Sequence, residues 1–171
     1  MTTTRPHIID TAAGLVAELA TICDRDIPAR ALVLLLVRPI ATGHYLIDST
    51  QCLAAVDGED IRSVGYTDHE AWAFTTSQTA YNVVAVVVDA AAEGPRQNFR
   101  WHSNVIEKAA ALLAERNTYF DAMYAATGTA PGSPVWSLDT AASLGEVPPI
   151  LPVPDETRWA LSRTVTVMPP F

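Results

Sequence analysis

The sequence predicts an α/β fold in which a mainly parallel central sheet is flanked by helices, in two or three layers. The main evidence is a pair of apolar runs, Ala31–Val37 and Val83–Val88, neither of which alternates with polar residues. Such runs are typical of strands that are covered on both faces, and the β-branched valines pack well in strands. Because the flanking stretches are helical in spacing, we expect Val83–Val88 to be a central parallel strand beside Leu32–Val37.

Length and composition indicate one globular domain over residues 1–171, with a proline-rich C-terminal segment at 147–171. The apolar fraction is 49% and the charged fraction 18%, so the disordered class is excluded. A net charge of −8 argues against nucleic acid or an anionic membrane as partner. No signal peptide or membrane-spanning run is evident, and we expect a soluble, cytoplasmic protein with reduced cysteines.

The remaining elements follow from local patterns. Asp10 or Thr11 is suited to cap a helix that runs to about Cys23. We expect further helices after Thr67 and from about Phe99 to Arg116. Further strands are predicted over residues 44–47, 118–126 and 135–138, with an edge strand near the C-terminus and an ambiguous stretch at 51–56.

Asp89 is the sharpest candidate for a ligand site. It follows the Val83–Val88 run directly, and open α/β sheets bind ligands at the carboxyl ends of their strands. We expect Arg38, at the end of the neighbouring strand, and Arg100, at the start of the helix predicted from about Phe99, to line the same crevice. The alternative is that Asp89 is a loop or cap carboxylate without a functional role.

Other local motifs favour structural roles. Three potential ligands are adjacent at Asp68–Glu70, but neighbours on a helix point in different directions, so no metal site is predicted. The GTAPGS stretch at 128–133 lacks the lysine of a phosphate-binding loop and is predicted to be a turn. No cofactor is indicated.

Two tryptophans in the last third of the chain, Trp136 and Trp159, flank the VPPILPVP stretch at 147–154. Aromatic residues beside a stiff extended segment lose little entropy on docking, and interfaces favour them. We therefore expect a non-catalytic protein-interaction or ligand-binding module whose partner is another protein or a second copy of the chain. The alternatives are that both tryptophans close the sheet, and that the protein is a small-molecule enzyme using the Asp89 crevice.

Three stretches resemble the actinobacterial family called domain of unknown function 4192. They are Leu15–Leu19 through Pro28 to Leu32–Val37, then Val83–Asp89 with the Ile106–Leu113 helix, and finally Gly132–Leu138 with Pro154–Asp155 and Ser162–Arg163. The chain departs from the family in having Ile22-Cys23-Asp24 before the proline turn, and in a condensed segment between Pro39 and Tyr66. The resemblance implies a soluble α/β protein of actinobacterial or phage type, and it implies no particular reaction.

Overall fold

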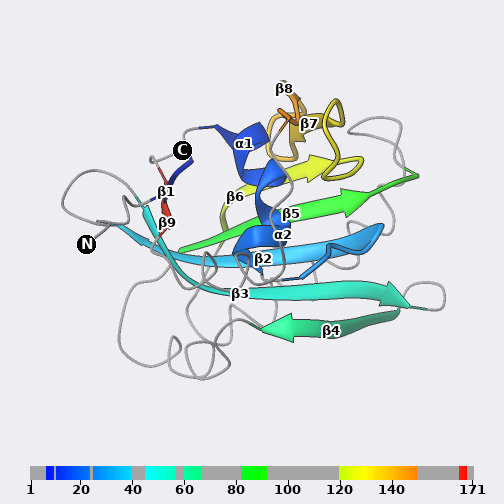
Figure 1. Ribbon diagram of the computed structural model, residues 1–171, viewed down its shortest axis with the longest axis horizontal. Helices are drawn as coiled ribbons and strands as arrows, with labels where there is room; N and C mark the ends of the chain where they lie inside the picture. The colour runs from blue at the N-terminus through cyan, green and yellow to red at the C-terminus, as the bar shows by residue number, and fades with distance from the viewer. Residues whose placement is uncertain are drawn as a thin grey trace.

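The computed structural model describes residues 7–9, 11–23, 25–39, 45–56, 60–66, 82–91, 120–149 and 166–168. Within these residues the chain forms one nine-stranded sheet with two short helices (Figure 1). The elements are β1 (His7–Ile8), α1 (Ala12–Ala17), α2 (Leu19–Ile22), β2 (Arg30–Pro39), β3 (Tyr45–Val56), β4 (Asp60–Tyr66), β5 (Asn82–Asp89), β6 (Phe120–Ala126), β7 (Pro134–Ser137), β8 (Ser143–Glu146) and β9 (Thr166–Met168).

The strand order is β1-β9-β3-β2-β5-β6-β7-β8, and β4 pairs with β3 outside this path. Among the described pairs only β5–β6 and β1–β9 are parallel, whereas β2–β3, β2–β5, β3–β4, β3–β9, β6–β7 and β7–β8 are antiparallel. The predicted mainly parallel, helix-flanked α/β sheet is therefore wrong. Val83–Val88 does lie beside Leu32–Val37, but the two strands run in opposite directions.

One of the antiparallel pairs, β2–β3, follows from the connection after β2. Five residues, 40–44, separate β2 from β3, and so short a link joins antiparallel neighbours because a parallel neighbour needs a crossover of a dozen or more residues. An apolar run reports that a strand is buried, but it carries no information about the direction of its neighbours. The predicted return strand at 44–47 and the ambiguous stretch at 51–56 together form the long strand β3.

Burial on both faces, which the two apolar runs predicted, is confirmed. Residues of β2 and β5 are buried along Ala31–Val37 and Val83–Asp89. One face of the sheet packs in a single cluster with α1 and α2, which lie across β2, β5 and β6 (Figure 1). This helix-covered face includes Val33 and Val86, while the opposite face includes Leu32 and Val87, which are paired in register and no less buried.

The predicted N-terminal helix is present in two short pieces. The Thr11 hydroxyl accepts a hydrogen bond of 2.9 Å from the Gly14 N–H, which confirms Thr11 as a helix cap. The helix is interrupted at Glu18, where φ is −105° and ψ is 5°. Leu15, Val16 and Leu19 are fully buried against the sheet. Cys23 closes α2 as a buried thiol that forms no disulfide with a described side chain.

Several predicted elements can be compared with the described strands. The strand predicted at 118–126 corresponds to β6, and the one at 135–138 to β7. A strand is present near the C-terminus as predicted, but β9 is not an edge strand, because it lies between β1 and β3. The helices predicted after Thr67 and over Phe99–Arg116 lie outside the described residues. Neither of the two described helices is long and apolar enough to cross a membrane.

Candidate functional site

Asp89 lies at the carboxyl end of β5 and is almost fully buried, with 1% of its side chain exposed. Its Oδ1 accepts a hydrogen bond of 2.9 Å from the Ala91 N–H, two residues further on. The same oxygen lies 3.8 Å from Nε of Arg30, whose side chain is 40% exposed. The carboxylate therefore caps the end of β5 and pairs with a cation on the next strand.

The arginine beside Asp89 is Arg30, which the sequence did not single out. Antiparallel pairing of β2 and β5 puts Arg30 directly opposite Asp89. Arg38 is eight residues further along β2, opposite Leu46 of β3, and thus about 27 Å from Arg30 along the strand. The structure does not bring Arg38 and Asp89 together. Arg100 lies outside the described residues.

These contacts favour the structural alternative for Asp89. A carboxylate that accepts a backbone N–H in the turn after its strand, and has a cation beside it, stabilises that strand end. Catalytic use of the same oxygen would compete with both contacts. The interpretation as a small-molecule enzyme with a crevice at Asp89 gains no support from this geometry.

Trp136 is also buried, with 4% of its surface exposed. It pairs with Ala125 of β6, on the sheet face opposite to the one that α1 and α2 cover. Among the described residues, none is a hydrogen-bond partner of its Nε1–H. Trp136 is therefore part of the sheet and does not present its ring at the surface, whereas Trp159 lies outside the described residues.

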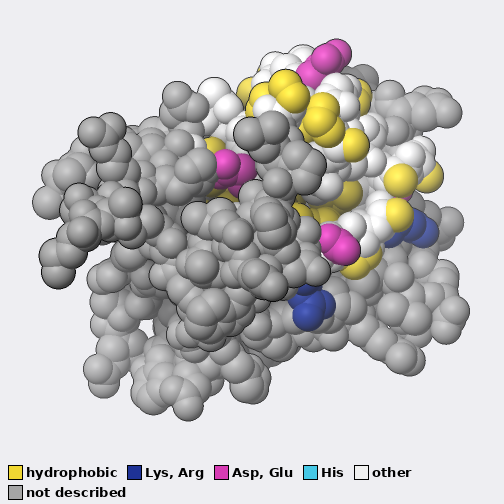
Figure 2. Space-filling view, in the orientation of Figure 1, with side chains coloured by type: hydrophobic (Ala, Val, Ile, Leu, Met, Phe, Trp, Pro, Cys, Tyr) yellow, Lys and Arg dark blue, Asp and Glu magenta, His cyan; other side chains and the backbone are white. Residues whose placement is uncertain are grey.

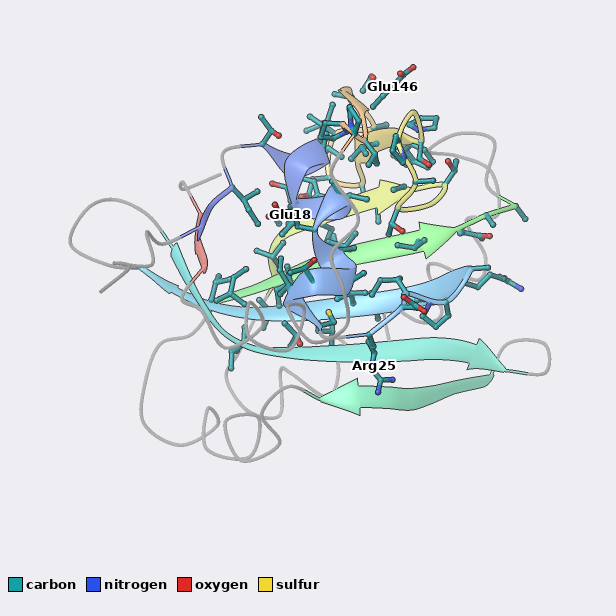
Figure 3. All side chains as sticks on the ribbon, viewed as in Figure 1. Glu18, Arg25 and Glu146 are labelled. Carbon is teal, nitrogen blue, oxygen red and sulfur yellow. The ribbon has the colours of Figure 1, made fainter. Side chains whose placement is uncertain are left out.

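The part of this region that does reach solvent is the neighbouring strand, β8. All four of its residues are exposed, and β8 stands at the end of the strand order. Leu144 is a large apolar side chain with 38% of its surface exposed. Figure 2 shows apolar side chains gathered over the β7–β8 end of the molecule, and Figure 3 shows Glu146 directed away from the sheet. The exposed residues at this end include Pro131, Pro134, Ala141 and Ala142.

The hydrogen bonds around β8 show which of its backbone groups face outward. Ser143 lies opposite Trp136 and Glu146 opposite Pro134. The bonds that hold β7 and β8 together at their ends come from the adjacent residues, Ser137 N–H to Ala142 O at 2.9 Å and Val147 N–H to Ser133 O at 2.8 Å. In an antiparallel pair, hydrogen-bonded and non-hydrogen-bonded residue pairs alternate. The pairs Ser143–Trp136 and Glu146–Pro134, which lie next to these bonds, are therefore non-hydrogen-bonded pairs. The N–H and C=O groups of Ser143 and Glu146 therefore point away from β7.

A bulge brings these two outward-facing residues onto the same edge. Three steps separate Ser143 from Glu146, whereas two steps separate their partners on β7. In a regular strand, residues three apart would point to opposite sides. The extra residue is accommodated near Gly145, whose φ is +96°. The Gly145 N–H bonds to the Ser143 hydroxyl at 3.4 Å.

The hairpin that carries β8 is held by side-chain hydrogen bonds. The Ser137 hydroxyl accepts the N–H groups of Asp139 and Thr140, each at 3.2 Å. The Asp139 carboxylate accepts the N–H of Met123 on β6, also at 3.2 Å. On the other side, the predicted turn at 128–133 does join β6 to β7, and its Gly132 N–H bonds to Val147 O at 2.9 Å. These hydrogen bonds fix the position of the hairpin that carries the exposed edge.

Three charged residues in other parts of the chain, Glu18, Arg25 and Glu146, lie apart from one another (Figure 3). The described side chains contain no group of three or more His, Cys, Asp or Glu residues placed to hold a metal ion. The Asp68–Glu70 stretch lies outside the described residues.

No family model, curated protein or solved structure matches the chain. The resemblance to domain of unknown function 4192 therefore stays a prediction.

Proposed function

We propose that the protein is a non-catalytic protein-interaction module that binds through the outer edge of β8. The observation that carries the proposal is the pair of outward-facing backbone groups at Ser143 and Glu146, on a strand that is exposed along its whole length. A strand edge of this kind is a template for pairing with an extended segment of another chain.

Two further features support this function. The hairpin is ordered by the hydrogen bonds of Ser137 and Asp139, so little conformational entropy would be lost when a partner binds. Leu144 offers an apolar contact beside the edge. Three features of β8 restrict which segments can pair with its edge: the bulge, the short length of the strand and the charge of Glu146. Natural proteins use such features to prevent non-specific pairing at exposed strand edges. The proposal is therefore specific pairing through two residues, and it predicts modest affinity.

The test compares Glu146→Pro with Glu146→Ala. Both remove the carboxylate, but only proline removes the outward N–H. Wild type and both variants are purified from the native host with a tag, and co-purifying chains, including untagged copies of this protein, are quantified. We expect a chain that accompanies wild type and Glu146→Ala to be lost with Glu146→Pro at an unchanged melting temperature.

A chain identified in this way must then be purified and shown to slow hydrogen exchange at the amides of Ser143 and Glu146. If Glu146→Pro proves unstable, Ser143→Asp replaces it, because a second carboxylate on the edge opposes pairing without altering the backbone. The same chains accompanying wild type and edge variants alike would refute the proposed function.

A further inference from the structure

The β8 edge is self-complementary, and we infer that its partner is a second copy of this chain, paired antiparallel about a two-fold axis that passes between Leu144 and Gly145. This inference rests on the proposed function and adds to it the identity and register of the partner. In a two-fold interface, when one residue of the first copy faces a second residue of the other copy, the second residue of the first copy also faces the first residue of the other. With the axis in this place, Ser143 faces Glu146 of the second copy, and Leu144 faces Gly145.

The backbone geometry fits this register. Ser143 and Glu146 are the two residues whose N–H and C=O groups point outward, and the symmetry operation pairs each with the other. Directly opposed residues of this type exchange two hydrogen bonds. The pairing would thus form four hydrogen bonds between the copies, and none of them needs the inner groups already directed at β7.

Side chains are compatible with the same register. Glu146 meets a serine and not a second carboxylate, so the like-charge repulsion of a Glu146–Glu146 contact is avoided. The half-exposed Leu144 meets Gly145, where an added Cβ would find no atom within 4 Å. That open space can take a leucine side chain from the second copy. Ser143 and Glu146 lie on one face of the sheet because their β7 partners, Trp136 and Pro134, are two residues apart.

The first experiment places either a positive or a negative charge opposite Glu146 and measures the effect on dimerisation. Ser143→Lys puts an ammonium opposite each Glu146 carboxylate, and Ser143→Asp puts a carboxylate there. A cross-strand charge pair contributes roughly 0.2–1 kcal/mol, and symmetry doubles it. By sedimentation velocity over a concentration series at low salt, we expect the dimer dissociation constant to fall roughly two- to thirtyfold with lysine and to rise comparably with aspartate. In a Ser143→Lys/Glu146→Lys double variant, repulsion should return.

The second experiment tests the register directly. Under mild oxidation the Ser143→Cys/Glu146→Cys variant should form a disulfide-linked dimer, because opposed residues have Cα atoms within the span of a disulfide. Ser143→Cys alone should not, since its two thiols would be three residues out of register. The wild-type chain, with Cys23 and Cys52, provides the background.

The outcomes separate this inference from the proposed function. A chain that stays monomeric at the highest attainable concentration, with no response to Ser143→Lys, overturns the two-fold dimer. The proposed function would survive that result if a different protein is lost with Glu146→Pro. A dimer that crosslinks equally well through Ser143→Cys alone would overturn the register. Loss of no chain with any edge variant, together with a monomeric wild type, would refute both.

Discussion

Arg30 and Asp89 lie directly opposite each other on β2 and β5, with Nε of Arg30 3.8 Å from Oδ1 of Asp89. This pairing exists only because the two central strands are antiparallel. In a parallel arrangement the carboxyl end of β2, with Arg38, would lie beside Asp89 instead. The relative direction of β2 and β5 can therefore be tested by measuring the energetic coupling between these side chains.

A double-mutant cycle should therefore find coupling between Arg30 and Asp89 and none between Arg38 and Asp89. The variants are Arg30→Met, Arg38→Met and Asp89→Asn, alone and in pairs, and the measurement is the free energy of unfolding in urea. Contacting residues typically couple by 0.5–3 kcal/mol, and we expect roughly 0.5–1.5 kcal/mol because the Arg30 side chain is partly solvated. Coupling to Arg38 and not to Arg30 would contradict the antiparallel register.

Ala141 offers a stabilising substitution. It has a φ of 59°, in the left-handed region that is unfavourable for a residue with a Cβ. Ala141→Gly relieves that strain at some cost in unfolded-state entropy, and we expect a net gain of roughly 0.5–1 kcal/mol in the free energy of unfolding. The neighbouring Ala142→Gly is the control and should be neutral or destabilising. A lower melting temperature for Ala141→Gly would argue against the described turn.

The Asp139 carboxylate ties the β7–β8 hairpin to β6 through the Met123 N–H. Asp139→Ala removes this acceptor, and we expect a loss of roughly 0.5–1.5 kcal/mol, as for one hydrogen bond near the surface. Asp139→Asn keeps an acceptor oxygen and should lose less. Hydrogen exchange at Met123 should accelerate in the alanine variant before exchange in β2 does. If the Met123 amide were protected from exchange equally in wild type and in Asp139→Ala, this hydrogen bond would not be what holds the hairpin to β6.

Trp136 carries a buried N–H that has no hydrogen-bond partner within the described part of the chain. Trp136→Phe removes that donor and keeps most of the aromatic contact area, so we expect a change in unfolding free energy within about 1 kcal/mol. Trp136→Ala, by contrast, should cost roughly 3–5 kcal/mol. If phenylalanine proved as damaging as alanine, the indole N–H would have to be making a contact that the structure does not contain.

The sequence by itself determined which residues are buried and where some of the helices and turns begin. The apolar runs of β2 and β5 correctly predicted burial on both faces, because the cost of exposing valine and leucine to water depends on each side chain alone. Thr11 predicted the start of α1 for a similar reason, since its hydroxyl reaches an N–H only three residues away. The turn at 128–133 was predicted from its own glycines and proline.

Only the tertiary structure decided which strands are neighbours and in which direction they run. Asp89 was correctly predicted to end a central strand, but its partner is Arg30, 59 positions earlier in the chain, and nothing local to Asp89 marks that residue. Likewise, the composition of β7 does not show that Trp136 is covered, and the bulge that turns Ser143 and Glu146 outward exists only relative to β7. Register and direction arise from pairing between distant segments, whereas an apolar run reports the burial of its own strand and not the direction of the strands beside it.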